Sequence, residues 1–351
     1  MAGNVALVAG ASGIIGAGVI EALRAAGGWR VKALATRPVE GVETLAVDLG
    51  DAEATREALR GAADTTHLFY AAYKPAPDFA AEVAVNGPML EHLLGGLRAV
   101  GAPLERAVLY QGAKVYGVHL GPVHAPFYED GPRHVPPNFY FTQEDALRRH
   151  AGEGGFGWSI LRPDVVIGDV SGNAMNMAMV VGVYAAVCHA TGTPFRFPGT
   201  AQVYDGVFAQ FTDARLLGRA SVWAATAEAA GGEAFNYVHE PFRWARVWGQ
   251  VGEALGLEVA APLRMTLAQQ MAGHGALWAR IAAEQGLVEA DYARLVGWGF
   301  GDFIFSTAFD MVSDMGKIRR AGFGETVDNG EALVGGIRRL QARKVLPAFA
   351  K

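Results

Sequence analysis

The sequence predicts a doubly wound α/β fold, in which helices cover both faces of a parallel β-sheet. Short apolar runs recur along the first half of the chain, and helical patterns separate them. The runs are apolar throughout instead of at every second residue, which is typical of strands that are buried on both faces. A chain of 351 residues that is 51% hydrophobic and 19% charged can also bury a large core.

The elements follow one another in a regular order. Strands are expected at "NVALVAG", "VKALATR", "ETLAVDL", "THLFYAA", "ERAVLYQG" and "GWSILRP", with helices at "GAGVIEALRAAG" and "DAEATREALRGA". After about residue 170 the alternation weakens, and we expect helices at 174–189, 245–255, 267–285 and 331–344. The run "EAFNYVH" (233–239) indicates a strand that returns to the sheet. We therefore expect a sheet domain over residues 1–170 and a smaller, mostly helical domain over 171–351.

A glycine-rich turn joins the first strand to the first helix. In "VALVAGASGIIGAGVIEAL" the glycines are Gly10, Gly13 and Gly16. They allow the backbone to turn sharply and to approach a pyrophosphate, which the helix N-terminus then stabilises. The position of this turn in an alternating chain predicts a Rossmann-type dinucleotide-binding domain, although a tight turn without a ligand would give the same letters.

The residues after the second and third strands bear on the choice of dinucleotide. An acid that would bind the ribose 2′-hydroxyl of NAD is expected after the second strand, but the sequence has Thr36 and Arg37 there. Arginine can pair with a 2′-phosphate, so NADPH is the expected cofactor. A solvated surface arginine would fit the same position. Asp48 and Leu49 follow the third strand, where an adenine ring would lie.

The stretch "NFYFTQEDALRRH" (138–150) opens a helix with Tyr140, four residues before Glu144. Related reductases place a lysine at that spacing, and an acid there would raise the pKa of the phenol above its usual value of about 10. Tyr-x-x-x-Lys does occur elsewhere, at Tyr70 with Lys74 and at Tyr110 with Lys114. Both of these tyrosines fall within strands, where residues four apart are separated by roughly 13 Å at about 3.3 Å per residue. Neither pair can act as a dyad.

Two motifs show a resemblance to a known family. The chain resembles the progesterone 5β-reductase and iridoid synthase-like enone reductases, a divergent branch of the extended short-chain dehydrogenases. Their Asn-Phe-Tyr-Tyr-x-x-Glu-Asp corresponds to residues 138–145, and their Gly-x-Lys-His-Tyr to residues 112–116. The likeness extends through "RFPG" (196–199), "FRWARVW" (242–248), "DMVSDMGKIRRAGF" (310–323) and "KVLP" (344–347).

The resemblance implies a catalytic tyrosine at Tyr140 and a catalytic lysine at Lys114, which comes from the end of the fifth strand. It also implies that Tyr140 borders the cofactor. The other implied cofactor contacts, taken with the glycine turn, are Gly10, Ser12, Gly13, Ile14, Ile15, Gly16, Thr36, Arg37, Asp48, Leu49, Ala72, Tyr73, Val166, Asn173, Ala174 and Met175.

Four positions depart from the family pattern. Val115 replaces a histidine, Phe141 a second tyrosine, Thr36 the first of two arginines, and Tyr73 a tryptophan beside the nicotinamide. The loss of one arginine weakens the case for strict use of NADPH. The other three changes leave Tyr140 and Lys114 in place, but they leave the substrate range open.

The reaction that the resemblance implies is 1,4-reduction of an enone or enal, a small-molecule substrate. Hydride adds to the β-carbon, and negative charge moves onto the carbonyl oxygen. A neutral tyrosine hydroxyl can stabilise that enolate by donating a hydrogen bond. Lys114 would orient Tyr140 or add positive potential.

Other classes of protein fit less well. A carbonyl reductase or sugar-nucleotide epimerase would need a lysine where Glu144 stands, and a cofactor-binding regulatory protein would need neither Tyr140 nor Lys114. "GASGI" lacks the last glycine of a hydrolase elbow. The spacing of the histidines predicts no metal site. These two alternative readings, an atypical C=O or sugar-nucleotide enzyme and a non-catalytic NADP-binding protein, stay open.

Composition and termini bear on location and partners. A net charge of -5 with dispersed basic residues argues against nucleic acid. Cys188 is the only cysteine and the start of the chain lacks a signal-peptide pattern, so we expect the reducing cytoplasm. The uncharged stretch 171–191 is interpreted as a buried helix, and no membrane partner is expected. The oligomeric state stays open, with a homodimer among the options.

Overall fold

The structure, a computed structural model, describes residues 3–349. At its centre is a seven-stranded sheet with the order β10-β6-β5-β4-β1-β2-β3, in which all neighbours run parallel. The strands are β1 (Asn4–Ala9), β2 (Trp29–Ala35), β3 (Glu43–Ala46), β4 (His67–Tyr70), β5 (Arg106–Tyr110), β6 (Gly157–Arg162) and β10 (Glu233–Asn236). The chain winds outward from β1 in both directions, which creates a crevice at the carboxyl ends of the strands. The predicted doubly wound α/β class is confirmed.

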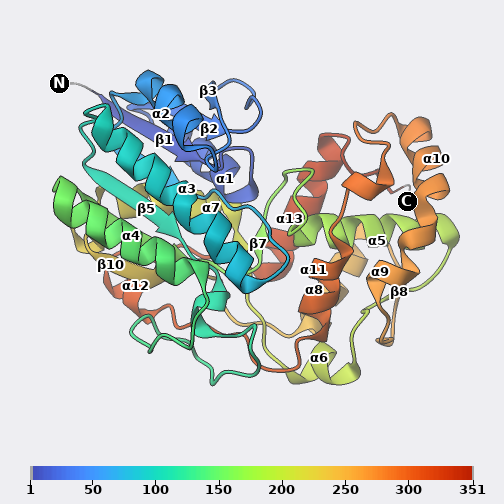
Figure 1. The fold of residues 1–351 in the computed structure, drawn as a ribbon. Coiled ribbons are helices and arrows are strands. Elements are labelled where there is room, and N and C mark those ends of the chain that lie inside the picture. The colour runs from blue at the N-terminus through green and yellow to red at the C-terminus, as the bar shows by residue number, and fades with distance from the viewer. Residues whose placement is uncertain (1–2, 350–351) are drawn as a thin grey trace.

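Helices cover both faces of this sheet (Figure 1). Helices α2, α3 and α4 pack on one face, and α1, α7 and α12 on the other. Their bounds are α1 (Ile14–Ala26), α2 (Ala52–Ala58), α3 (Phe79–Ala99), α4 (Phe139–Gly154), α7 (Ala214–Thr226) and α12 (Gly316–Arg320). Successive residues of β1 serve the two cores, because Leu7 packs with the α3 side and Val8 with the α1 side. This double burial explains why the strands are apolar at every position.

Three elements from beyond residue 170, namely β10, α7 and α12, join the sheet and the helices that cover it. β10 pairs with β6 at the edge of the sheet, which confirms the returning strand. Helix α7 packs closely against α1, and two glycines without side chains permit this approach. A Cβ at Gly18 would lie only 2.1 Å from the Ala214 carbonyl oxygen, and a Cβ at Gly218 would lie 2.1 Å from the Gly18 carbonyl oxygen. The division of the chain into domains at residue 170 stays a prediction. The returning segments follow residue 170 in the sequence but pack with the sheet.

The remaining helices build a second core around aromatic rings. They are α5 (Met177–Thr191), α6 (Ala201–Gly206), α8 (Trp244–Leu255), α9 (Leu267–Gln270), α10 (Gly275–Gln285), α11 (Trp298–Ser306) and α13 (Asn329–Ala342). Trp248 stacks on Phe195 at 4.2 Å between ring centroids, and both rings are fully buried. Two short strand pairs, β7 (Val166–Ile167) with β9 (Thr212–Asp213) and β8 (Phe195–Arg196) with β11 (Val259–Ala260), complete this part.

Helix boundaries differ from the expected ones where polar or small residues interrupt a pattern. The helix expected at 267–285 is divided, because α9 ends at Gln270 and a short 3-10 turn over Ala272–His274 precedes α10. Gly273 and Gly275 stand at this break, and glycine weakens a helix interior. The helix expected from 174 begins at Met177, because the side chain of Asn176 caps it by accepting a hydrogen bond from the Ala178 amide.

The uncharged stretch after residue 171 forms α5, which is buried from Met177 to Cys188. Burial raises the pKa of the Cys188 thiol, which favours an inert side chain. Within residues 3–349, no helix combines the length and the apolar character needed to cross a membrane.

Candidate active site

The glycine turn forms a cradle at the carboxyl end of β1. Gly10 has a φ of +74°, and a Cβ there would lie 2.6 Å from the backbone of Ala71. A Cβ at Gly16 would lie 2.4 Å from the Gly10 carbonyl oxygen, so both positions require glycine. Helix α1 starts after Gly13 and has no side-chain cap. Its first amides are therefore available to a pyrophosphate, and the local geometry fits a dinucleotide. The intervening Ser12 is half-buried, while Ile14 is buried and Ile15 half-buried.

The residues predicted to bind the adenosine end lie after β2 and β3. Thr36 and Arg37 are exposed directly after β2. The Arg37 guanidinium lies near Gly172, 3.8 Å from the position a Cβ there would take, so the loop that carries Asn173 passes close to it. An exposed cation at this edge fits a 2′-phosphate.

Asp48 and Leu49 follow β3 with contrasting surroundings. Leu49 is buried, whereas Asp48 is exposed and accepts a hydrogen bond from the Lys74 ammonium at 3.0 Å. The hydrogen bond from the Gly50 amide, together with Lys74, lowers the pKa of the Asp48 carboxyl. Lys74 is one of the lysines that follows a strand tyrosine, and here it serves this ion pair instead of a tyrosine.

Helix α4 presents Tyr140 in its first turn. Asn138 caps the helix, since its side-chain oxygen accepts a hydrogen bond from the Tyr140 amide at 2.9 Å. The same side chain donates to the Lys114 carbonyl oxygen at 2.9 Å, which joins the tyrosine motif to the lysine motif. The Tyr140 hydroxyl lies 2.9 Å from the position that a Cβ would take at Gly112. A residue larger than glycine at 112 would therefore displace the phenol.

Lys114 lies in the 3-10 turn Ala113–Tyr116 that directly follows β5. Its ammonium donates to both carboxylate oxygens of Glu82, at 3.2 and 3.3 Å. Glu82 comes from the first turn of α3 and is only 6% exposed. It also accepts a hydrogen bond of 2.6 Å from the Tyr73 hydroxyl. The lysine that the sequence singled out is thus held by an acid that sequence reasoning missed.

The environment of Glu144 corrects one expectation. Glu144 does not raise the pKa of Tyr140; burial raises that pKa to about 12, and the nearby charges of Glu82 and Asp164 add to the effect. Glu144 instead accepts hydrogen bonds from Gln111 and Arg148, at 3.1 and 2.7 Å. Burial alone would raise the pKa of Glu144, but these partners hold it below its ordinary value.

Glu144 belongs to a buried network beneath the site. Gln111 donates to the Tyr140 carbonyl oxygen at 3.2 Å as well as to Glu144, and its own side-chain oxygen accepts from Arg162 at 2.9 Å. Gln111 and Arg162 follow or end the neighbouring strands β5 and β6. The acid in the place of the usual lysine therefore anchors the start of α4 to the sheet.

The segment after β6 holds the remaining predicted contacts and a further acid. Asp164 accepts a hydrogen bond from the Val165 amide at 3.0 Å, and burial raises the pKa of its carboxyl to about 7. Val165 has a φ of +34°, a conformation that is strained for a β-branched residue and is typical of functional segments. Val166 follows in β7, and the Asn173 side chain accepts from the Met175 amide at 2.9 Å. Ala174 packs against Gly297, just before α11.

The predicted residues thus gather around the carboxyl ends of β1, β2, β3, β4, β5 and β6. Ala72 and Tyr73 follow β4, and the Tyr73 ring packs on Phe139 at 5.4 Å between centroids. Glu82 and Asp164 are the two functional candidates that sequence reasoning missed. An acid in the first turn of a helix is common, so Glu82 carries no distinctive signal. Asp164 stands directly after Arg162-Pro163, and its place at the end of a strand could have marked it.

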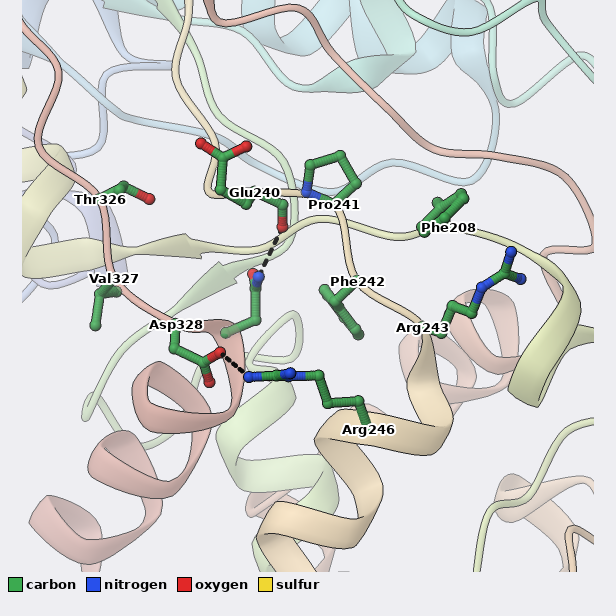
Figure 2. Close-up of a pocket in the computed structure, with 10 residues that line it drawn as sticks. Phe208, Glu240, Pro241, Phe242, Arg243, Arg246, Thr326, Val327 and Asp328 are labelled. Carbon is green, nitrogen blue, oxygen red and sulfur yellow. Dashed lines mark hydrogen bonds and ion pairs between the residues drawn. The ribbon is translucent and has the colours of Figure 1, made fainter.

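A separate hollow of about 520 Å³ is lined by residues 208, 240–243, 246 and 326–329, and none of the predicted site residues lines it. Figure 2 shows its lining side chains. Arg246 pairs there with Asp328 at 3.3 Å, and the Arg243 guanidinium lies over the Phe208 ring at 4.3 Å. Because these charges find partners within the chain, we assign this hollow no part in the reaction. Within residues 3–349, no three His, Cys, Asp or Glu side chains are grouped so that they could hold a metal ion.

The fold and the cradle together define a Rossmann-type dinucleotide-binding protein. Residues 31–347 match the family described as a PRISE-like Rossmann-fold domain, and the chain belongs to this family. It is 31% identical to an (S)-8-oxocitronellyl enol synthase of Camptotheca acuminata, over 98% of this chain and 93% of that protein. It is 30% identical to a 3-oxo-Delta(4,5)-steroid 5-beta-reductase of Arabidopsis thaliana, again over 98% and 93%.

Solved structures share the fold at lower identity. The UDP-glucose 4-epimerase of Thermus thermophilus, in complex with NAD, superposes with a TM-score of 0.67 at 20% identity, covering 96% of this chain and 99% of that one. The epimerase Mth375 of Methanothermobacter thermautotrophicus gives 0.70 at 17% identity, covering 97% and 93%. At these identities the likeness shows the fold alone.

Proposed function

We propose that this protein is an NADPH-dependent enone reductase, which reduces the C=C bond of α,β-unsaturated carbonyl compounds. The observation that carries the proposal is the meeting of the two motifs: the half-buried Tyr140 has a phenol pKa raised to about 12, so it is neutral at pH 7, and Asn138 joins its helix to the Lys114 turn. Relatives named as a steroid 5-beta-reductase and as an enol synthase cover nearly the whole chain, which supports the same chemistry.

The cofactor half of the proposal rests on the cradle. Gly10 and Gly16 let the turn pack closely on the chain's own backbone, which leaves the uncapped start of α1 available to a pyrophosphate, and Arg37 offers a cation for a 2′-phosphate. NADPH, when bound, would supply the hydride. The remaining predicted contacts follow β3, β4 and β6, on the same edge of the sheet as Tyr140.

The substrate half rests on Tyr140. As hydride reaches the β-carbon, negative charge develops on the carbonyl oxygen. The Tyr140 hydroxyl keeps its proton far above neutral pH and can donate a hydrogen bond to that oxygen. A fixed donor in a buried site needs no reorganisation when the charge appears, so it favours the enolate. Gly112 and Phe139 hold the phenol in place, the Phe139 ring at 4.1 Å between centroids.

Carbonyl reduction and epimerisation require a tyrosine that exchanges its proton readily. Here the position four residues after Tyr140 holds Glu144, which is already bound by Gln111 and Arg148. The cation that the lysine motif supplies, Lys114, is bound by Glu82. This arrangement favours a tyrosine that donates a hydrogen bond over one that transfers its proton.

The substrate is a small molecule, and we infer a cytoplasmic location from the single, buried Cys188. We further infer a homodimer as the assembly to test, which light scattering of the purified protein would measure.

The function is tested by following NADPH oxidation with a panel of small enones, enals and steroid-like enones. Oxidation that depends on an enone or enal supports the proposal. A panel without turnover, in protein that binds NADPH, would support the non-catalytic alternative.

A further inference from the structure

Glu82 is a buried carboxylate whose two described side-chain partners both belong to the candidate site. It accepts from the Tyr73 hydroxyl and from the Lys114 ammonium, at 2.6 Å and 3.2 Å for the same oxygen. Its side chain is almost fully enclosed, while that of Lys114 is 38% exposed. A carboxylate is rarely buried without a cation, so Glu82 and Lys114 form a matched pair.

The pair sets the charge that a substrate meets beside Tyr140. Lys114 contributes one positive charge from the end of β5, and Glu82 cancels it from α3. His119 also lies close to Lys114, and burial, aided by the charge of Lys114, lowers the pKa of its imidazole below the ordinary value of 6.5, which favours the neutral ring at pH 8. Asp164, which follows β6, is an acid whose pKa burial raises to about 7, so it adds no cation to the site. The Lys114–Glu82 pair beside the phenol therefore carries no net positive charge.

We propose, on the basis of the enone reductase function proposed above, that Glu82 determines the charge of the accepted substrate. Because it neutralises Lys114, the site takes uncharged unsaturated ketones and aldehydes and discriminates against conjugated carboxylates. An anionic ligand placed at Tyr140 would face the Glu82 carboxylate, and the nearby cation Lys114 is already paired with that carboxylate. With Glu82 uncharged, Lys114 becomes free to attract such a ligand.

A pair of ligands that differ only in charge tests this inference. Cyclohex-1-enecarboxylate and cyclohex-1-enecarboxamide have nearly the same shape, and at pH 8 the first is anionic and the second neutral. Their dissociation constants are measured by calorimetry on the complex of the protein with 1,4,5,6-tetrahydro-NADP, a redox-inert analogue whose nicotinamide ring is neutral like that of NADPH, for the wild type and for Glu82→Gln. Glutamine keeps an acceptor for Tyr73 and removes the charge. We expect the ratio of the carboxylate constant to the carboxamide constant to fall at least tenfold in Glu82→Gln.

A matched control lies on the same helix. Glu91 also belongs to α3, but it pairs with Arg149 and His150 on α4, away from Tyr140. Glu91→Gln should leave the ratio unchanged. A double variant, Glu82→Gln with Lys114→Met, should lose the gain, because the freed cation is its source. Thermal unfolding and NADP⁺ affinity of each variant show whether the fold is kept.

The inference is overturned by equal changes for both ligands in Glu82→Gln, by a gain that persists without Lys114, or by wild-type protein that binds the carboxylate as tightly as the carboxamide. If neither ligand binds to the wild type or to any variant, the inference is also overturned, because the charge at Tyr140 then does not govern binding. Failure of the enone reductase function is detected separately, by product analysis with neutral enones.

Discussion

At Tyr140 the phenol is enclosed between the Gly112 backbone and the Phe139 ring. This enclosure, more than any single charge, raises its pKa to about 12. Glu144 follows four residues later, and its carboxylate points away to accept a hydrogen bond from Gln111. Gln111 also donates to the Tyr140 carbonyl oxygen, so Glu144 helps to hold the backbone of α4. The two acids that do act on the phenol, Glu82 and Asp164, come from other elements.

Replacing Tyr140 by phenylalanine tests its role as a hydrogen-bond donor. Turnover should fall by roughly ten- to a thousandfold, the usual range for the loss of one such donor. NADPH affinity should hardly change, and activated enals should lose least. Lys114→Ala should cost less than Tyr140→Phe, because Lys114 is a supporting charge already neutralised by Glu82. Steady-state kinetics and cofactor titration measure these effects.

The pH–rate profile separates a donor from an activated acid. A phenol with a pKa of about 12 should show no ionisation through neutrality in the wild type. If the rate falls with a pKa near 7 and Tyr140→Phe abolishes that fall, the tyrosine is an activated acid and the mechanism proposed above is wrong. A fall near pH 7 that persists in Tyr140→Phe would belong to another group, such as Asp164.

Asp164 makes a second prediction, for stability. Burial raises its pKa from 3.8 to about 7, so between these values the folded protein holds a proton that the unfolded chain has released. The free energy of unfolding therefore decreases as pH rises through this window, by at most about 4 kcal/mol, and the loss stays constant above it. Asp164→Asn lacks this loss. The melting temperature of Asp164→Asn minus that of the wild type should therefore increase between pH 4 and 7 and stay constant at higher pH. A difference that does not change with pH would contradict the raised pKa of Asp164.

At the scale of elements, the ends of the strands supply most of the site. Arg37 follows β2 and lies near the loop at Gly172, and we propose that its guanidinium binds the 2′-phosphate of the cofactor. Its replacement by alanine should raise the NADPH dissociation constant at least tenfold, about 1.4 kcal/mol, and leave that of NADH nearly unchanged. Fluorescence titration with both cofactors measures this. Equal losses for both would remove Arg37 from the 2′-phosphate site.

Elements were predicted well where periodicity is strong and less well at their ends. All six expected strands and the returning β10 form the sheet. The division of the helix at 267–285 was missed, because two glycines inside an apolar pattern do not reveal whether packing will hold the helix together. The start of α5 was missed by three residues, because the cap at Asn176 depends on a side-chain hydrogen bond.

At the scale of the molecule, the sheet order explains how distant motifs meet. β4, β5 and β6 are neighbouring parallel strands, so the residues that follow each of them lie together at the carboxyl ends of the strands. Tyr140 and Lys114 were identifiable from their motifs, and the structure brings their segments together through Asn138. Glu82 was not identifiable, because its role arises only when the first turn of α3 packs beside Lys114, which lies 32 residues later in the chain. Spacing along a sequence does not report such contacts.

We propose that this site reduces C=C and leaves C=O intact, and the product formed from 2-cyclohexenone with NADPH distinguishes the two reactions. Gas chromatography of the reaction separates the saturated ketone, cyclohexanone, from the allylic alcohol, 2-cyclohexenol. A neutral Tyr140 that stabilises an enolate predicts cyclohexanone as the main product, with its formation strongly reduced in Tyr140→Phe. 2-Cyclohexenol as the main product would contradict the account and place the protein among the carbonyl reductases.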